Sequence, residues 1–338
     1  MQKDARHAKA QYMATVLLKS RVPLVYVQLV ALVCLAGFLD AAPLYDAIEY
    51  YAGRRAITRA MHTSFLRVAA YDIVDSQYGE RDMLSPHGMV FAIMLACCTI
   101  PGGFAWFAPV CSSWIWMCTS VTGRCAGFPM GRSWVPQVSD GNVMYARTLL
   151  LARHFDAFGC VAMLEQPALS VMQYADRFQQ WIADQLVFMS PELCLGLFGA
   201  TSKKPIRVFS NFPFVHELLQ HAPLTTLLSS SECLSTVSWH VDADGQTKKR
   251  TTGNAVAMKE SQGYPDSFGC AVATVYMSHR QSLMQGARQK THVHTAELVD
   301  VSELLQAKPC DMWQDADLGP VFDYLMGILP HVKIWCRE

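Results

Sequence analysis

The sequence predicts an α/β fold in which helices cover both faces of a mostly parallel sheet. Two observations lead to this prediction. Apolar runs of strand length alternate with helical segments, and this alternation is typical of a parallel sheet covered by helices. The first such unit, residues 46–73, also has the order of a nucleotide-binding strand, turn, helix and second strand.

The unit over 46–73 carries residue types that suit a nucleoside ligand. Its first strand leads into Ala52 and Gly53, and a helical segment follows. A glycine at this turn lets the backbone approach a ligand, and a helix N-terminus favours anionic groups. Asp72 closes the second strand 19 positions after Gly53, near the roughly 20-residue offset of a ribose-binding acid. Only one of the usual glycines is present, so a purely structural turn stays an alternative.

The other elements are predicted from the spacing of their apolar residues. Ser85 and Pro86 form a helix-start signal, and apolar residues then recur at three and four positions. Apolar runs of about four to eight residues fit buried strands. The predicted strands span 46–51, 68–73, 104–110, 160–164, 205–209 and 236–240, and the predicted helices span 56–63, 86–99 and 142–158.

The composition is that of a globular chain without a dedicated nucleic-acid surface. Hydrophobic residues make up 51% of the 338 residues and charged residues only 17%, which excludes a disordered chain. The formal net charge is zero, whereas a nucleic-acid surface normally needs clustered Lys and Arg. A basic cluster at 248–250 follows the turn-like segment 242–245, so we expect it in a solvated loop.

The twelve cysteines are scattered, and none of them forms a CxxC pair. We interpret most of them as small buried hydrophobic residues in a reducing, intracellular compartment, nuclear or cytoplasmic. Cys97 and Cys98 are adjacent, so a vicinal disulfide is an alternative. His292 and His294 could ligate a metal from one strand face, but no third ligand is indicated. We therefore expect exposed histidines and predict no metal site.

The amino terminus combines a basic region with an apolar run. Five Lys and Arg residues precede the run over 22–39, which is almost wholly apolar. This arrangement resembles a signal peptide or signal anchor, although the run barely reaches the roughly 18 residues needed to span a membrane. A helix packed on the domain is the other interpretation. The predicted organisation is an N-terminal segment over 1–42, a main domain over 43–285 and a C-terminal extension over 286–338.

Two polar side chains are expected at the carboxyl ends of further strands, where open α/β sheets bind their ligands. Cys111 follows the strand predicted over 104–110, and adjacent backbone amides could activate a thiolate nucleophile there. Glu165 follows the strand predicted over 160–164 and could hold or protonate a heterocycle that faces the thiol. The structural alternatives are a small residue closing a strand for Cys111 and a helix cap for Glu165.

Five short segments occur in an order that resembles the motifs of AdoMet-dependent DNA cytosine 5-methyltransferases. The segments are 49–53 (Glu-Tyr-Tyr-Ala-Gly), Asp72, 109–111 (Pro-Val-Cys), 165–167 (Glu-Gln-Pro) and 259–268 (Lys-Glu-Ser-Gln-Gly-Tyr-Pro-Asp-Ser-Phe). The similarity covers roughly residues 44–285. The Pro-Val-Cys-Ser-Ser-Trp and Leu-Glu-Gln-Pro blocks are also similar to the divergent methyltransferase-like family of dinoflagellate genomes. The resemblance implies a Rossmann-like AdoMet-dependent methyltransferase fold.

The resemblance also implies a set of cofactor-binding residues. Tyr51, Ala52 and Gly53 would shape the pocket for the methionine part of AdoMet. Asp72 would bind its ribose. Asp82 stands where an acid that contacts the adenine could lie. S-adenosyl-L-methionine is therefore the expected cofactor.

The implied chemistry rests on two residues. Cys111 would attack the pyrimidine ring, and Glu165 would bind the ring nitrogen while the methyl group transfers. A base inside a duplex would have to be flipped out to reach them. The chain departs from the family pattern at Arg54, Val110 and Gln166, which replace a small residue, a proline and an asparagine.

These departures keep several functions open. The leading hypothesis is a methyltransferase that acts on cytosine in nucleic acid. The alternative is a catalytically degenerate binding protein on the same scaffold, with 22–39 as its membrane tether. A hydrolase that uses Cys111 is disfavoured, because no histidine lies near the Cys111 or Glu165 loops in the sequence. The sequence indicates neither the methyl acceptor nor an oligomeric state.

Overall fold

A six-stranded sheet forms the centre of the protein. The computed structural model describes residues 2–38, 43–200, 203–223, 235–241, 244–253 and 263–332. The strands of the central sheet are β1 (Tyr45–Tyr50), β2 (Val68–Tyr71), β3 (Thr99–Phe107), β4 (Val161–Pro167), β5 (Glu192–Cys194) and β6 (Pro205–Ser210). Their spatial order is β2-β1-β3-β4-β6-β5. The first four strands are parallel, and β6 runs antiparallel to both β4 and β5.

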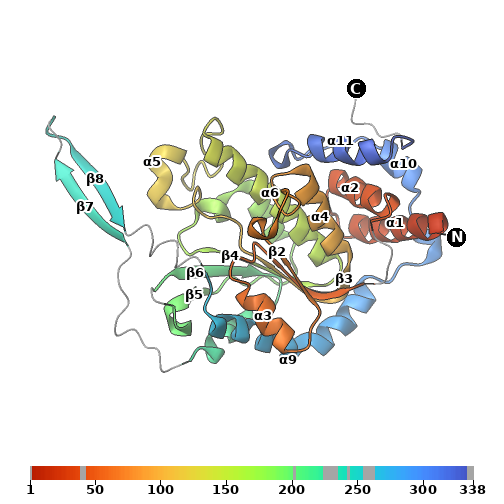
Figure 1. Ribbon diagram of the computed structural model, residues 1–338, viewed down its shortest axis with the longest axis horizontal. Coiled ribbons are helices and arrows are strands. Elements are labelled where there is room, and N and C mark those ends of the chain that lie inside the picture. The colour runs from red at the N-terminus through yellow and green to blue at the C-terminus, as the bar shows by residue number, and fades with distance from the viewer. Residues whose placement is uncertain are drawn as a thin grey trace.

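Helices cover both faces of this sheet, so the predicted α/β class with a mostly parallel sheet is confirmed (Figure 1). In the view of Figure 1, α1, α2, α4, α6, α10 and α11 lie above the sheet, and α3 and α9 lie below it. The described α-helices are α1 (Gln2–Lys19), α2 (Leu24–Leu35), α3 (Ala56–Thr63), α4 (Pro86–Cys97), α5 (Thr119–Thr122), α6 (Pro136–Ala157), α7 (Asp176–Ala183), α9 (Asp266–Lys290), α10 (Val301–Gln306) and α11 (Gly319–Ile328).

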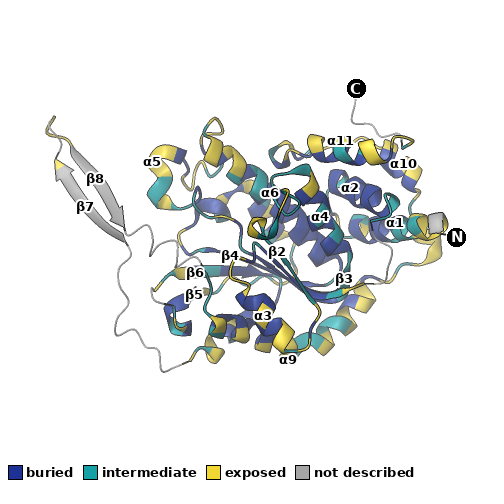
Figure 2. Ribbon diagram, viewed as in Figure 1, coloured by how far each residue is buried: buried dark blue, intermediate teal, exposed yellow. Residues whose placement is uncertain are grey.

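Successive residues of the central strands point alternately into two separate hydrophobic cores. Ile48 and Tyr50 of β1 join the core under α4 and α6, whereas Ala47 joins the core over α3 and α9. Because both faces are covered, the central strands are buried along nearly their whole length, as Figure 2 shows in dark blue. This double burial explains why these strands read as continuous apolar runs in the sequence.

The apolar run near the amino terminus is a buried helix. Ten consecutive residues of α2, Val25 to Cys34, are buried, and α2 packs against α1, α4, α10 and α11. The side-chain amide of Gln28 donates to the carbonyls of Leu304 and Ala307, at 2.8 and 2.7 Å. These contacts agree with the packed-helix interpretation of 22–39.

None of the described helices has the length and apolar character that a membrane span requires.

The C-terminal segment is tied to the main body through Arg147 of α6. This buried guanidinium donates to the carbonyls of Ala316 and Asp317, and also to that of Met83 before α4. The boundary expected near residue 285 falls inside α9, which continues to Lys290. Residues on either side of that boundary therefore share one helix.

Several predicted boundaries were wrong for reasons of tertiary structure. The strand predicted over 160–164 continues to Pro167, because β6 pairs with Glu165 and Gln166. The strand predicted over 104–110 begins at Thr99 and ends at Phe107. Residues 248–250, expected in a loop, belong to β8 (Thr247–Gly253), which pairs antiparallel with β7 (Ser235–Val241) in a separate hairpin.

The close contact between α3 and α9 gives a testable prediction. A Cβ atom on Gly269 would overlap the backbone carbonyl of Ala56, whereas one on Gly286, also in α9, would meet nothing within 4 Å. Gly269→Ala should lower the free energy of unfolding by about 1–3 kcal/mol through overpacking. Gly286→Ala should raise it by about 0.5–1 kcal/mol, because alanine is the better helix former.

Urea unfolding of the two variants beside the wild type measures both effects. A Gly269→Ala variant as stable as Gly286→Ala would show that α3 and α9 are not in close contact.

Candidate functional site

The strand order places a candidate site at the carboxyl ends of β1 and β3. The chain passes from β1 to the edge strand β2 and then returns across β1 to β3. In open α/β sheets, ligands bind beyond the carboxyl ends of the strands at such a reversal. Tyr50 and Phe107, the last residues of β1 and β3, are register partners. The segments that contain Gly53 and Cys111 both leave the sheet at this point.

Asp72 holds the turn between β1 and α3. The backbone N–H of Gly53 donates to one carboxylate oxygen of Asp72 at 2.8 Å, and that of Val74 donates to the other at 3.0 Å. Tyr51, Gly53 and Arg55 have left-handed φ angles of 60°, 47° and 56°. A Cβ on Gly53 would meet nothing within 4 Å. The glycine therefore serves the backbone conformation and leaves open space beside the turn.

The other expected cofactor residues lie around this turn. The Tyr51 hydroxyl is 2.7 Å from the Thr148 hydroxyl of α6, so this side chain points into the core. Burial raises the pKa of Tyr51, and the charges of Asp82 and Asp72 act in the same direction. Asp82 accepts a backbone hydrogen bond from Leu84 at 2.9 Å. Asp72 and Asp82 are thus both close enough to Tyr51 to act on it electrostatically.

The loop that contains Cys111 is fixed from several directions. The side-chain amide of Gln166 donates to the Pro109 carbonyl at 2.9 Å, which ties the loop to β4. The Trp114 backbone N–H donates to the Cys111 carbonyl at 2.9 Å. The buried guanidinium of Arg124 stacks 3.5 Å from the centre of the Trp114 ring. Gln166, which departs from the family asparagine, therefore positions this loop.

The Cys111 thiol is not activated by its surroundings. Burial and the nearby charge of Glu165 raise its pKa to about 11, and the charge of Lys204 offsets only part of this effect. The residues around Cys111 therefore do not lower the pKa of its thiol, and its expected role as a nucleophile stays a prediction.

Glu165 lies inside β4, not after it as predicted, and it forms a hydrogen bond with a residue from far along the chain. Only 6% of Glu165 is exposed. Its Oε2 accepts a hydrogen bond of 2.8 Å from the Tyr264 hydroxyl. Its Oε1 is buried and has no hydrogen-bond partner among the described residues. Tyr264 also lies 3.4 Å from the indole nitrogen of Trp106, in β3.

A second buried acid, Glu49, lies on the same face of the sheet. Glu49 pairs in register with Trp106, and the strand partner of Trp106 is Met163, two residues before Glu165. Glu49 Oε2 accepts hydrogen bonds from the backbone and hydroxyl of Thr58, at 2.7 and 2.5 Å, and thereby caps α3. Burial raises the pKa of Glu49.

The sequence analysis assigned no role beside Cys111 and Glu165 to three residues that lie there: Trp106, Lys204 and Tyr264. Tyr264 belongs to the Gln-Gly-Tyr-Pro-Asp segment, which attracted attention only through the family resemblance. Trp106 was one apolar residue of a predicted strand. Lys204 precedes β6, far from Cys111 in the sequence, so no local pattern could have identified it.

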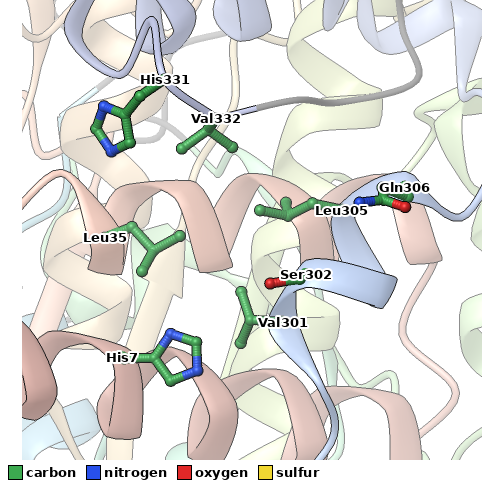
Figure 3. A pocket seen from close by; sticks show the side chains of 8 residues that line it. All are labelled: His7, Leu35, Val301, Ser302, Leu305, Gln306, His331 and Val332. Atoms are coloured by element: carbon green, nitrogen blue, oxygen red, sulfur yellow. The ribbon is translucent and has the colours of Figure 1, made fainter.

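Other candidate features lie away from this edge. His292 and His294 have ring centres 4.7 Å apart, and the described residues contain no group of three metal-ligating side chains. A cavity of about 300 Å³ lies among α1, α2 and α10 (Figure 3). It is lined by His7, Leu35, Val301, Ser302, Leu305, Gln306, His331 and Val332, none of them an expected site residue.

The raised pKa of Cys111 predicts a distinctive alkylation profile. Because the thiolate reacts, the rate with iodoacetamide should rise roughly tenfold per pH unit from pH 7 to pH 10. At pH 7, Cys111 should react at least tenfold more slowly than the exposed Cys125, Cys270 and Cys310.

Peptide mass spectrometry of briefly alkylated, folded protein gives the rate at each cysteine. Glu165→Gln removes the neighbouring charge and should accelerate the reaction of Cys111 alone. A Cys111 rate that levels off below pH 8 would contradict the described surroundings of the thiol.

Comparison with protein-family models, with curated proteins and with solved structures finds no match to this chain.

Proposed function

We propose that the protein is an AdoMet-dependent methyltransferase of the cytosine 5 type, on a Rossmann-like methyltransferase fold. One observation carries the proposal. Three neighbouring parallel strands bring the Gly53 turn, Cys111 and Glu165 to one edge of the sheet, at the reversal of strand order. The sequence motifs that resemble this family are thus neighbours in space as well as ordered in the chain.

The turn after β1 supplies the features that a nucleoside cofactor needs. Open space beside Gly53 gives a ligand access to the backbone. The carboxylate of Asp72 accepts one backbone hydrogen bond on each oxygen, and each oxygen has a second acceptor position for a ribose hydroxyl. Tyr51, Ala52 and Asp82 would complete the cofactor site, with Asp82 directed to the adenine.

The proposed reaction uses Cys111 as a temporary nucleophile. Its thiol would lose a proton to solvent, and the sulfur would form a bond to one carbon of the pyrimidine C=C double bond, which makes the adjacent ring carbon electron-rich. AdoMet, held by Tyr51, Ala52, Gly53, Asp72 and Asp82, would supply an electrophilic methyl group to that carbon. A ring proton and the Cys111 thiolate then leave, which restores the ring double bond. Glu165 holds the ring nitrogen throughout.

A second function is favoured by two observations at the same site. Burial and the charge of Glu165 raise the pKa of the Cys111 thiol, and one oxygen of Glu165 accepts a hydrogen bond from Tyr264. Both suit a binding protein that retains a methyltransferase scaffold without catalysis. This alternative also binds AdoMet or a nucleoside but forms no covalent adduct at Cys111.

Cofactor binding gives the first test. Asp72→Ala removes charge-assisted hydrogen bonds of about 1.5–3 kcal/mol and should weaken AdoMet binding at least tenfold in a calorimetric titration. Asp140→Ala, an exposed acid of α6, is the matched control and should leave the affinity unchanged. Equal affinity in the wild type and Asp72→Ala would place any AdoMet site elsewhere.

Methyl transfer gives the second test, with labelled AdoMet and a single-stranded oligonucleotide that contains cytosine. Cys111→Ser should abolish transfer and leave the AdoMet affinity within about twofold, because the sulfur attacks the acceptor and not the cofactor. AdoMet binding without transfer by the wild type would favour the binding protein. Transfer that survives Cys111→Ser would refute the cysteine mechanism.

A further inference from the structure

We infer that Tyr264 is a positioning residue for Glu165, and that it leaves one carboxylate oxygen free for a hydrogen-bond donor of the acceptor base. The inference rests on the proposed function, because it assigns a role at the same site. It adds a residue from the segment before α9 to a site otherwise built from β1, β3 and β4. It also specifies that the ligand presents an N–H or NH₂ group to Glu165.

The position of Tyr264 is fixed by the packing of its neighbours. Asp266, which opens α9, forms an ion pair with Arg59 of α3. Gly269 packs directly on the Ala56 carbonyl at the start of α3. Gly263 lies against the side chain of Arg54, so the backbone on both sides of Tyr264 is held next to the β1–α3 turn.

The Tyr264 ring is oriented by three aromatic or cationic contacts. It packs edge-to-face on Trp106, with ring centres 5.7 Å apart, and lies 5.2 Å from the ring of Phe268. The Lys204 ammonium stands 5.7 Å from the ring centre. These contacts direct the hydroxyl toward the end of β4.

The direction of the hydrogen-bond chain follows from donor chemistry. The indole N–H of Trp106 can only donate, so the Tyr264 oxygen accepts in the 3.4 Å contact between them. The Tyr264 hydroxyl therefore donates its single hydrogen bond to Glu165 Oε2, at 2.8 Å. Trp106, Tyr264 and Glu165 thus form a chain that fixes the carboxylate in one orientation.

The remaining oxygen of Glu165 indicates the chemistry of the ligand. Oε1 is buried without a hydrogen-bond partner among the described residues, and such a group carries a desolvation cost. An N–H or amino group on a planar heterocycle would satisfy it, whereas an anion would be repelled. Glu165 also acts electrostatically on Cys111, so a heterocycle bound here lies next to the thiol.

Tyr264→Phe tests the assignment, because it removes only the hydroxyl. The probe is a single-stranded oligonucleotide with one 5-fluorocytosine, which in the presence of AdoMet stops the proposed reaction at the covalent adduct. The rate of adduct formation should fall at least tenfold, whereas the AdoMet affinity should stay within twofold. Tyr276→Phe is the control, because Tyr276 lies on α9 and donates to the Gly102 carbonyl, away from the site.

A double variant separates positioning from a general structural effect. If Tyr264 acts only through Glu165, Tyr264→Phe should cause no further loss in a Glu165→Gln background. The assignment is overturned if the two losses multiply, if Tyr264→Phe matches the wild type, or if it weakens AdoMet binding as much as adduct formation.

Failure of the proposed function is recognised separately. A wild type that forms no adduct refutes the cysteine chemistry, whatever Tyr264 does. The hydrogen bond between Tyr264 and Glu165 is then tested by urea unfolding of the wild type, Tyr264→Phe, Glu165→Gln and the double variant. We expect at least fivefold coupling between the two substitutions in the unfolding equilibrium constant. Additive effects would overturn the positioning role as well.

Discussion

The parallel pairing of β1 with β3 is the contact on which the site depends. It puts the reversal of strand order between these strands, so the segments that follow them leave the sheet side by side. It also pairs Glu49 with Trp106. Because β3 pairs with β4 in turn, Glu165 lies on the same face of the sheet as these two residues. A shift of one residue would turn these side chains to the other face. The register of three strands therefore decides whether a site exists.

The second determinant is the packing of α9 against α3, which brings the end of the chain back to its beginning. Arg59 and Asp266 join these helices across most of the sequence, and Gly269 lets them approach at the Ala56 carbonyl. The result is a site with opposing properties. Burial and the charge of Glu165 raise the pKa of the Cys111 thiol, which opposes the role that we propose for it.

Local patterns predicted the elements well where their neighbours in space are also neighbours in sequence. The helix over 56–63 followed from the spacing of one unit. The true end of β4 did not, because the pairing that extends it comes from β6, about forty residues later. The placement of Tyr264 and Lys204 and the raised pKa of Cys111 depend likewise on tertiary contacts. The apolar run over 22–39 was ambiguous because its cover, α10 and α11, lies at the other end of the chain.

We propose that one carboxyl edge of the sheet binds a nucleoside cofactor. Hydrogen–deuterium exchange with and without AdoMet tests the location of binding directly, because it reports backbone amides one segment at a time. We expect slower exchange at 50–55 and 72–75, where the Gly53 and Val74 amides donate to Asp72. Exchange that AdoMet leaves unchanged there, or slows only around the cavity among α1, α2 and α10, would contradict it.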